Sequence, residues 1–157
     1  MLVKEIMKRD LVTVRRSTML RELVARLQDF HTFPLVPVVE EDYRLIGTVS
    51  FENLIDVFQP YESGFLKAIP FLEREEIDIF DLEITPEMST LIVVDDMMET
   101  NVLTVSEEDA LEKAYNLMKI HSVDRLPVVD QKRRLVGMIG VFDILVALFR
   151  EKGIIGD

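Results

Sequence analysis

The sequence predicts an α/β (α+β) fold in which two copies of a strand, helix, strand, strand, helix (βαββα) unit pack about a pseudo-twofold axis. Three segments of the first half recur about 90 residues later: residues 5–14 as 96–105, 37–39 as 127–129, and 45–47 as 135–137. The signals for helices and strands also follow the same order in each copy. A unit of about 55 residues has too small an interior to be secure alone, so the two copies are expected to share a core.

Each copy begins with a short strand that ends in Thr-Val, and an amphipathic helix follows it. The helix is indicated by apolar residues at i, i+3, i+4 and i+7. These are Leu20, Leu23, Val24 and Leu27 in the first copy, and Leu111, Ala114, Tyr115 and Met118 in the second.

Two β-branched runs come next and predict a hairpin in each copy. The predicted strands are 36–39 and 45–50 in the first copy, and 126–129 and 135–139 in the second. A last helix, over 52–58 or 142–149, is predicted from the helical spacing of its apolar residues.

The repeats divide the chain into four parts: repeat one (1–58), an inserted segment (59–93), repeat two (94–150) and a C-terminal tail (151–157). In the insert, apolar residues over 65–72 predict a short helix, and partial alternation with acids over 77–84 predicts an extended stretch. So many apolar residues indicate that the insert packs on something. That surface is either the module itself, the partner subunit of a homodimer, or an enzyme or transporter that the module regulates.

Composition excludes several classes of function. The 157 residues include 18 Lys+Arg, 29 Asp+Glu and no Cys, and a net charge of -11 argues against a nucleic-acid partner or an anionic membrane surface. Ten of the acids, with only two basic residues, lie in 59–96, so the repeats are nearly neutral and leave room for a small phosphate ligand. The absence of Cys fits the cytoplasm. No signal peptide and no membrane insertion are expected, because the most apolar window, 135–149, is too short to span a bilayer.

Each copy resembles a CBS domain, and the pair resembles a Bateman module, which is a tandem of two such domains. The resemblance depends on the joint order of four features that occur twice: Met-Lys/Glu-x-Asp/Asn-x-x-Thr-Val, a helix, Pro-Val-Val, and Leu-x-Gly before a polar helix start. It implies a stand-alone, non-catalytic regulatory protein without a required cofactor. Such a protein would sense energy or metabolite state by binding AMP, ADP, ATP or S-adenosylmethionine in the cleft between the copies.

The resemblance also implies partners. A homodimer formed through the CBS helices is expected, and the regulated partner is an enzyme or a transporter. The alternative is a structural or interaction module, used for homodimerisation or docking, whose ligand sites are degenerate.

The ligand signature of the family, Gly-h-x-Thr/Ser-x-x-Asp with h apolar, is split between the copies. The first copy keeps the hydroxyl at Ser50 but has Asn53 in place of Asp, whereas the second has Gly140 in place of the hydroxyl and keeps Asp143. A carboxylate can accept hydrogen bonds from both hydroxyls of a ribose, and Gly140 offers a backbone N–H and close approach. Asp143 is therefore expected to bind ribose, with a helix N-cap as the alternative; for Ser50 and Asn53 the capping role is at least as plausible.

Other candidate ligand residues come from the resemblance. Arg125 matches a basic residue that reaches the ligand phosphates, although an ion pair with Asp124 or Asp130 is the alternative. Thr13 and Thr104 match a Thr near which the backbone meets adenine, but they also fit plain strand residues. The apolar strand residues expected beside the adenine are Pro37, Val38, Leu126, Pro127 and Ile139.

No catalytic or metal site is expected. The two histidines, His31 and His121, lack the carboxylate spacing of a metal site and have no serine placed beside them as a nucleophile. The acidic clusters 40–42 and 107–109 are interpreted as solvated charge, and the second suits a helix start.

Overall fold

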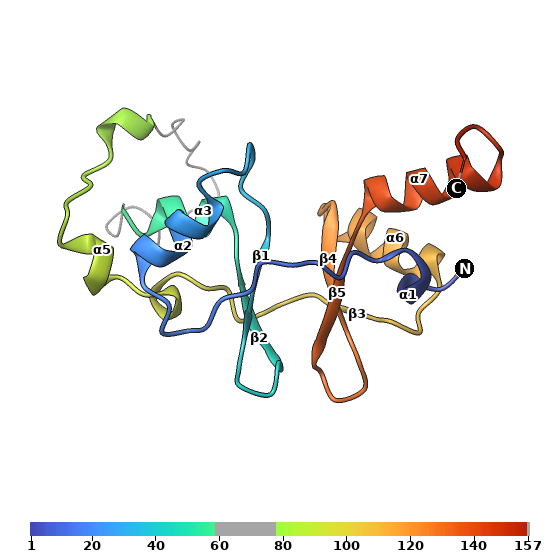
Figure 1. Ribbon diagram of the computed structural model, residues 1–157, viewed down its shortest axis with the longest axis horizontal. Coiled ribbons are helices and arrows are strands. Elements are labelled where there is room, and N and C mark those ends of the chain that lie inside the picture. Colours follow the sequence, from blue (N-terminus) through green and yellow to red (C-terminus); the bar gives the residue numbers. More distant parts are fainter. Residues whose placement is uncertain (59–77, 157) are drawn as a thin grey trace.

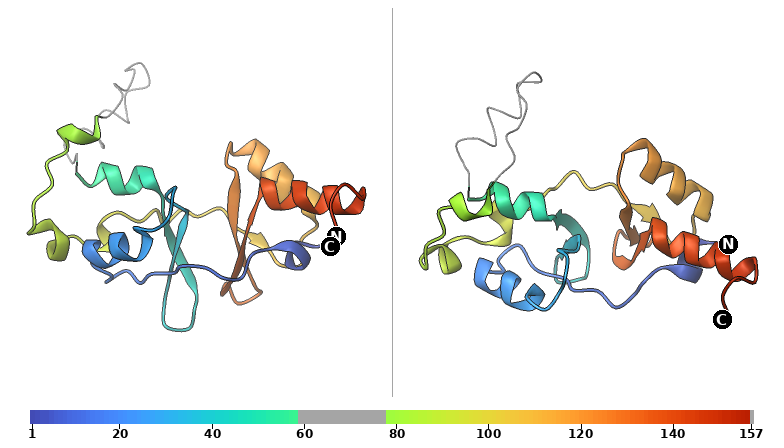
Figure 2. Two further views of the ribbon diagram at one scale, coloured as in Figure 1. Left: turned by 45° about the horizontal axis from the view of Figure 1, so that its top comes forward. Right: turned by 90° about the horizontal axis from the view of Figure 1, so that it is seen from above.

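The fold is seen in a computed structural model that describes residues 1–58 and 78–156. Two β-hairpins lie side by side in the middle of the molecule, and the helices of each repeat lie at the two ends (Figures 1 and 2). In the first repeat, β1 (Val36–Val39) pairs antiparallel with β2 (Leu45–Val49). In the second, β4 (Arg125–Val129) pairs antiparallel with β5 (Leu135–Gly140) and parallel with β3 (Val105–Ser106). The predicted α/β architecture is confirmed.

The four helices predicted in the repeats are confirmed as α2 (Leu20–Leu27), α3 (Phe51–Asp56), α6 (Leu111–Ile120) and α7 (Val141–Glu151). The apolar faces of α2 and α6 are narrower than expected, because Val24 and its repeat equivalent Tyr115 are 45% and 40% exposed. The buried residues of these two helices are Leu20, Leu23 and Leu27, and Leu111, Ala114 and Met118.

The opening strand is formed more fully in the second repeat than in the first. There it is β3, whereas in the first repeat Val14 makes only an isolated parallel bridge to Val38. This bridge is the repeat equivalent of the pairing of Val105 with Val128 in β3 and β4. The Val14 N–H donates to the Pro37 carbonyl at 3.1 Å, and the Val39 N–H donates to the Val14 carbonyl at 2.9 Å.

Residues 1–58 and 78–156 include four short elements that the sequence did not predict. They are α1 (Val3–Ile6), η1 (Ile79–Asp81), α5 (Met88–Leu91) and η2 (Val94–Asp96). The 3-10 turn η1 interrupts the extended stretch expected over 77–84, because the Asp78 carboxylate accepts the Phe80 N–H at 3.0 Å and starts a helical turn. The helix predicted over 65–72 lies outside the described residues.

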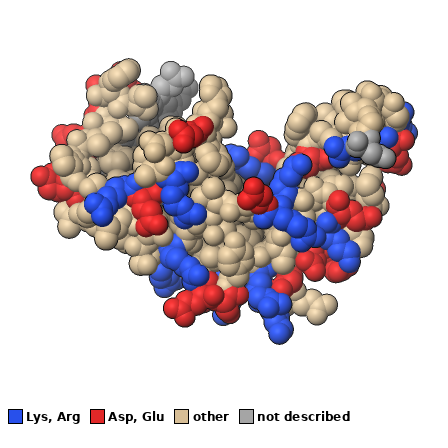
Figure 3. All heavy atoms as spheres, viewed as in Figure 1, with Lys and Arg blue, Asp and Glu red and all other residues tan. Residues whose placement is uncertain are grey.

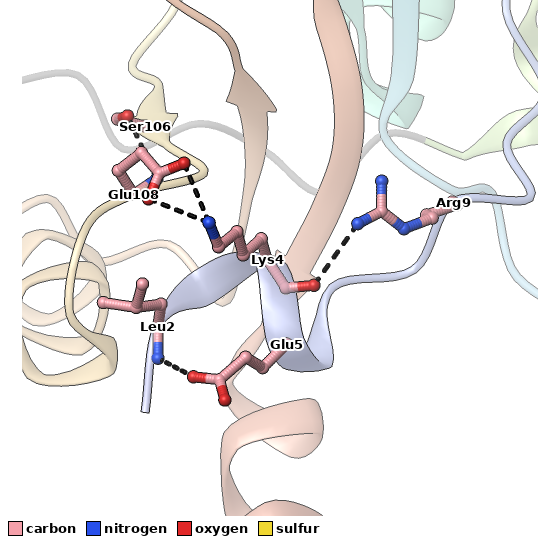
Figure 4. Close-up of polar contacts among 6 residues, drawn as sticks. All are labelled: Leu2, Lys4, Glu5, Arg9, Ser106 and Glu108. Carbon is pink, nitrogen blue, oxygen red and sulfur yellow. Dashed lines mark hydrogen bonds and ion pairs between the residues drawn. The ribbon is translucent and has the colours of Figure 1, made fainter.

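The start of each repeat packs on the other repeat. Val3 and Met7, in and just after α1, are buried in the core of the second repeat beside Leu111. Val94 and Met97, in and just after η2, are buried in the core of the first repeat. In the close-up of the α1 contacts, the Lys4 ammonium lies 3.0 Å from the Glu108 carboxylate (Figure 4). The opening segment of each repeat therefore completes the core of the other repeat.

Two segments, one after α1 and one after η2, cross from one repeat to the other. Each of these crossing segments is hydrogen-bonded to a hairpin, and the repeat relates the two sets of bonds. Lys8 and Met138 exchange two backbone hydrogen bonds of 2.9 Å each, and their equivalents Glu99 and Thr48 exchange two of 2.8 and 2.9 Å. The hairpins also join directly: the Leu45 N–H donates to the Arg133 carbonyl at 3.0 Å, and the Leu135 N–H donates to the Tyr43 carbonyl at 2.9 Å. This matched set of contacts is the pseudo-twofold arrangement that the repeat predicted.

The end of the inserted segment lies on the first repeat. Met88 of α5 and Ile92 just after it pack against the core that contains Leu23. The Ile92 carbonyl also accepts the Leu20 N–H at 2.9 Å. This part of the insert therefore covers the start of α2.

Candidate functional site

A cavity of about 630 Å³ lies between the two repeats. Cavities of this size are suited to small ligands. In the space-filling view the upper edge of the molecule is hollowed between the repeats, and acidic and basic side chains both lie near the hollow (Figure 3). The first repeat contributes Asp10, Leu11, Val12, Phe30, Pro34, Leu35 and Pro37; the second contributes Asp124, Arg125, Met138, Ile139, Gly140, Val141, Phe142, Asp143 and Leu145.

The two repeats contribute different chemistry to the cavity. Leu35 and Pro37, with residues 10–12 of the crossing segment, provide a wall that is apolar apart from Asp10. The second repeat provides the hairpin end at Arg125 and the start of α7, where Asp143 lies. The cavity can therefore hold a flat apolar group on one side and hydrogen-bond a polar group on the other.

Asp143 lies at the cavity with one carboxylate oxygen already bonded. Its Oδ2 accepts the Gly140 N–H at 2.8 Å, its Oδ1 lies 3.9 Å from the Lys8 ammonium, and its side chain is 21% exposed. Gly140 is the N-cap and Asp143 is the third residue of α7, so Asp143 takes part in capping this helix in the way that Asn53 does in α3. Its bond to Gly140 is one half of a capping box, and Oδ1 has no closer partner than the Lys8 ammonium among the described residues.

Arg125 also lines the cavity, and its nearest carboxylate is that of Asp124. The Arg125 Nε lies 3.5 Å from the Asp124 Oδ1, and both side chains are exposed. Asp130 pairs instead with Arg134, at 2.8 Å. Desolvation raises the pKa of the Asp130 carboxyl, but hydrogen bonds from Arg134 and from the Lys132 N–H outweigh it, so this pKa lies below its usual value.

Five of the candidate residues line this cavity, and the other seven lie elsewhere. Pro37 and Ile139 lie in its wall with Arg125, Gly140 and Asp143. The remaining apolar candidates are buried in the hairpins: Val38 and Leu126 belong to the two separate cores, and Pro127 is buried in β4. Thr13 and Thr104 each lie directly before a buried valine of their repeat. The Thr13 carbonyl accepts a hydrogen bond from the Arg26 Nη1 at 2.6 Å, and Thr104 comes directly before β3.

Ser50 and Asn53 cap α3. The Ser50 hydroxyl accepts the Asn53 N–H at 3.2 Å, and the Asn53 side-chain oxygen accepts the Ser50 N–H at 2.9 Å. This reciprocal pair is a complete capping box, so the structure gives both residues a local structural role.

Replacing Ser50 with alanine is expected to lower the free energy of unfolding by about 0.5–2 kcal/mol, because the Asn53 N–H loses its acceptor. Urea denaturation measures this change. Ser89→Ala, which removes an exposed hydroxyl that donates to the Pro86 carbonyl, serves as the control and is expected to cost less. Equal losses in the two variants would contradict the capping role.

Sequence reasoning missed the contribution of the crossing segment and the aromatic residues at the cavity. Asp10, Phe30 and Phe142 all line it; Asp10 and Phe30 stand outside the ligand signature, and Phe142 occupies a position that the signature leaves unspecified. Asp10 stands in the opening motif, so its place in the repeat was visible in the sequence. Its position at the cavity was not, because that depends on the chain crossing between the repeats.

Within residues 1–58 and 78–156, no group of three His, Cys, Asp or Glu side chains is placed to hold a metal ion. His31 and His121 are both exposed. None of the described helices is long and apolar enough to cross a membrane.

Comparison with known proteins gives a family and several relatives. The family model described as "CBS domain" matches residues 3–59 and 94–150. A CBS domain-containing protein of Dictyostelium discoideum is 28% identical over 149 residues, which cover 95% of this chain and 92% of that protein.

Solved structures share the fold over nearly the whole chain. The structure of CBSX2 in complex with AMP has a TM-score of 0.70 at 24% identity, covering 96% of this chain and 98% of that one. The CBS domain pair of protein MJ0100, in complex with 5'-methylthioadenosine and S-adenosyl-L-methionine, has a TM-score of 0.65 at 20% identity and covers 97% and 98%.

Proposed function

This chain belongs to the CBS domain family, and from that premise we propose that it is a non-catalytic regulatory module that binds an adenosine-containing ligand between its repeats. The observation that carries the proposal is the position of Asp143. Its carboxylate lies at a cavity of about 630 Å³ whose opposite wall is largely apolar. The ligands in the structures of CBSX2 and MJ0100, which share this fold, support the same ligand class.

The cavity suits the two halves of an adenosine. A carboxylate accepts hydrogen bonds from both hydroxyls of a ribose, and each of its oxygens accepts more than one. Asp143 therefore binds the ribose while keeping its bond to the Gly140 N–H. Leu35, Pro37 and Ile139 bury the faces of the adenine, which stabilises the complex by removing apolar surface from water.

Ligand binding couples to the arrangement of the repeats because the cavity is lined by both of them. A ligand shifts such an arrangement only if it binds one form more tightly than another. The relative position of the two hairpins is the quantity that would change. An enzyme or transporter in the cytoplasm would respond to that change, so the module would report the energy or metabolite state of the cell to the protein that it regulates.

Isothermal titration with AMP, ATP and S-adenosylmethionine tests the proposal. At least one is expected to bind, and Asp143→Asn is expected to weaken it about tenfold or more, since a hydrogen bond to a charged group contributes about 1.5–3 kcal/mol. The amide keeps an acceptor for Gly140, as Asn53 does for Ser50, so the helix start is preserved.

The matched control is Glu52→Gln, which neutralises an exposed carboxylate in the first turn of α3. This variant is expected to bind as the unmodified chain does. If none of the three ligands raises the melting temperature at millimolar concentration, the ligand-binding proposal fails, because a ligand at 100 times its dissociation constant stabilises by about 2.7 kcal/mol.

A second candidate function is a structural module that dimerises or docks through its helices. The C-terminal half of α7 presents an apolar face that favours it, because Leu148 and Phe149 are 42% and 38% exposed. A groove of about 610 Å³ also runs beside this face, between α6 and α7. In a homodimer through the CBS helices, Leu148→Asp is expected to convert the dimer to a monomer by light scattering; a dimer that persists would contradict this interface.

A further inference from the structure

The cavity between the repeats is lined by more carboxylates than cations. Among the described residues its lining includes Asp10, Asp124 and Asp143, and Arg125 is its cationic side chain. We propose that this cavity selects an adenosyl ligand whose 5' substituent is cationic, a sulfonium nucleoside such as S-adenosylmethionine, over nucleotides with 5' phosphates. The inference builds on the adenosine-binding function proposed above and specifies the ligand class.

Arg125 is poorly placed to hold a phosphate. Its Nε lies 3.5 Å from the Asp124 Oδ1, so the guanidinium already faces a carboxylate at the cavity. A phosphate that bound here would displace Asp124 or lie beside it, and like charges at close range repel. The guanidinium therefore offsets one of the three carboxylates and leaves the lining acidic.

The N-terminus of α7 has also lost part of its capacity to bind an anion. The N–H groups of a helix start favour phosphate when they are free. Here the Gly140 N–H donates to the Asp143 carboxylate at 2.8 Å, and the Val141 N–H donates to the Asp124 carbonyl at 2.9 Å. Gly140 also lacks the hydroxyl that its repeat equivalent Ser50 has, so this helix start offers no side-chain donor at that position.

Other features of the cavity suit a cation. Phe30 and Phe142, which come from opposite repeats, line it and are 47% and 73% exposed. Aromatic faces attract sulfonium and ammonium groups. The Asp10 carboxylate has no hydrogen-bond or ion-pair partner among the described residues, so it is available to a ligand ammonium.

Lys8 is a cation near the cavity that does not reverse this balance. The Lys8 ammonium lies 3.9 Å from the Asp143 Oδ1, and its side chain is 72% exposed. A pair that is this long and this exposed contributes little and is screened by salt. With Asp124 facing Arg125, Asp10 and Asp143 remain the carboxylates that set the preference for charge.

Isothermal titration with S-adenosylmethionine, S-adenosylhomocysteine, AMP and ATP tests this inference. S-adenosylmethionine is expected to bind at least about tenfold more tightly than ATP, with the thioether S-adenosylhomocysteine between them because it lacks the sulfonium charge. Raising the salt concentration is expected to reduce this ratio, since screening weakens the interaction of the ligand with the carboxylates.

Asp10→Asn identifies the residue responsible. Asn stands at the equivalent position of the second repeat, as Asn101, so the fold accepts it. The variant is expected to lower the ratio of S-adenosylmethionine to ATP affinity about threefold or more, whereas Glu41→Gln, in the exposed hairpin turn, is expected to leave it unchanged. If ATP binds as tightly as S-adenosylmethionine, the charge selection is overturned and the adenosine-binding function stands. If none of the four ligands binds, both are overturned.

Discussion

Replacing Val3 with aspartate is expected to unfold the second repeat before the first, although Val3 belongs by sequence to the first. Its side chain is 0% exposed and lies in the core of the second repeat with Leu111 and Met118. A carboxylate at that position would be buried without a partner, which costs several kcal/mol. We expect a loss of at least about 4 kcal/mol in the free energy of unfolding.

Urea denaturation measures this loss, and amide hydrogen exchange locates it. Exchange is expected to accelerate first in α6 and β4, whose residues share the core with Val3. Val24→Asp is the matched control, because it makes the same substitution at a site that is 45% exposed, and it is expected to cost about 1 kcal/mol or less. Acceleration confined to α2 and β1 in the Val3 variant would show that α1 does not complete the second repeat.

Replacing Gly137 or Gly47 with alanine is expected to cost about 1–3 kcal/mol each, since an added methyl group would overpack the crossing between the repeats. A Cβ at Gly137 would lie 2.9 Å from the Lys8 carbonyl oxygen, and one at Gly47 would lie 2.9 Å from the Glu99 carbonyl oxygen. Backbone atoms must then move, which disturbs the paired hydrogen bonds of Lys8 and Glu99 with the hairpins. Urea denaturation checks both losses.

Gly156→Ala is the control, because nothing lies within 4 Å of the position that its Cβ would take. It is expected to change stability by less than about 0.5 kcal/mol. The two crossing variants are expected to behave alike, since the repeat relates them. If Gly137→Ala were as stable as Gly156→Ala, the crossing segment would not hold the hairpins as closely as the structure indicates.

The sequence predicted the regular elements because their signals are local. Apolar spacing identified α2, α6 and α7, and the β-branched runs identified the two hairpins to within about one residue. Val24 and Tyr115 show the limit of this reasoning. Periodicity places both on the apolar face of a helix, yet each is exposed, because spacing does not report how wide the partner surface is.

Part of the candidate site was also readable from the sequence. Asp143, Arg125 and Gly140 stand in motifs that the repeat aligned, and all three line the cavity. For Ser50 and Asn53 the sequence offered a capping role and a ligand-binding role, and the hydrogen bonds between them show the capping role. Asp10 and Phe30 of the first repeat joined these residues only when the two repeats were placed together.

The sequence by itself determined that this protein is a tandem repeat with an acidic insert, since repetition and composition are properties of the chain alone. Only the tertiary structure decided which core each opening segment completes. Val3 and Val94 look alike in the sequence, because both are apolar residues that precede a repeated motif. Both are buried, but the sequence does not indicate which repeat buries each of them. The exchange of these segments joins the repeats, and it also brings Asp10 from one repeat to the cavity beside Asp143 of the other.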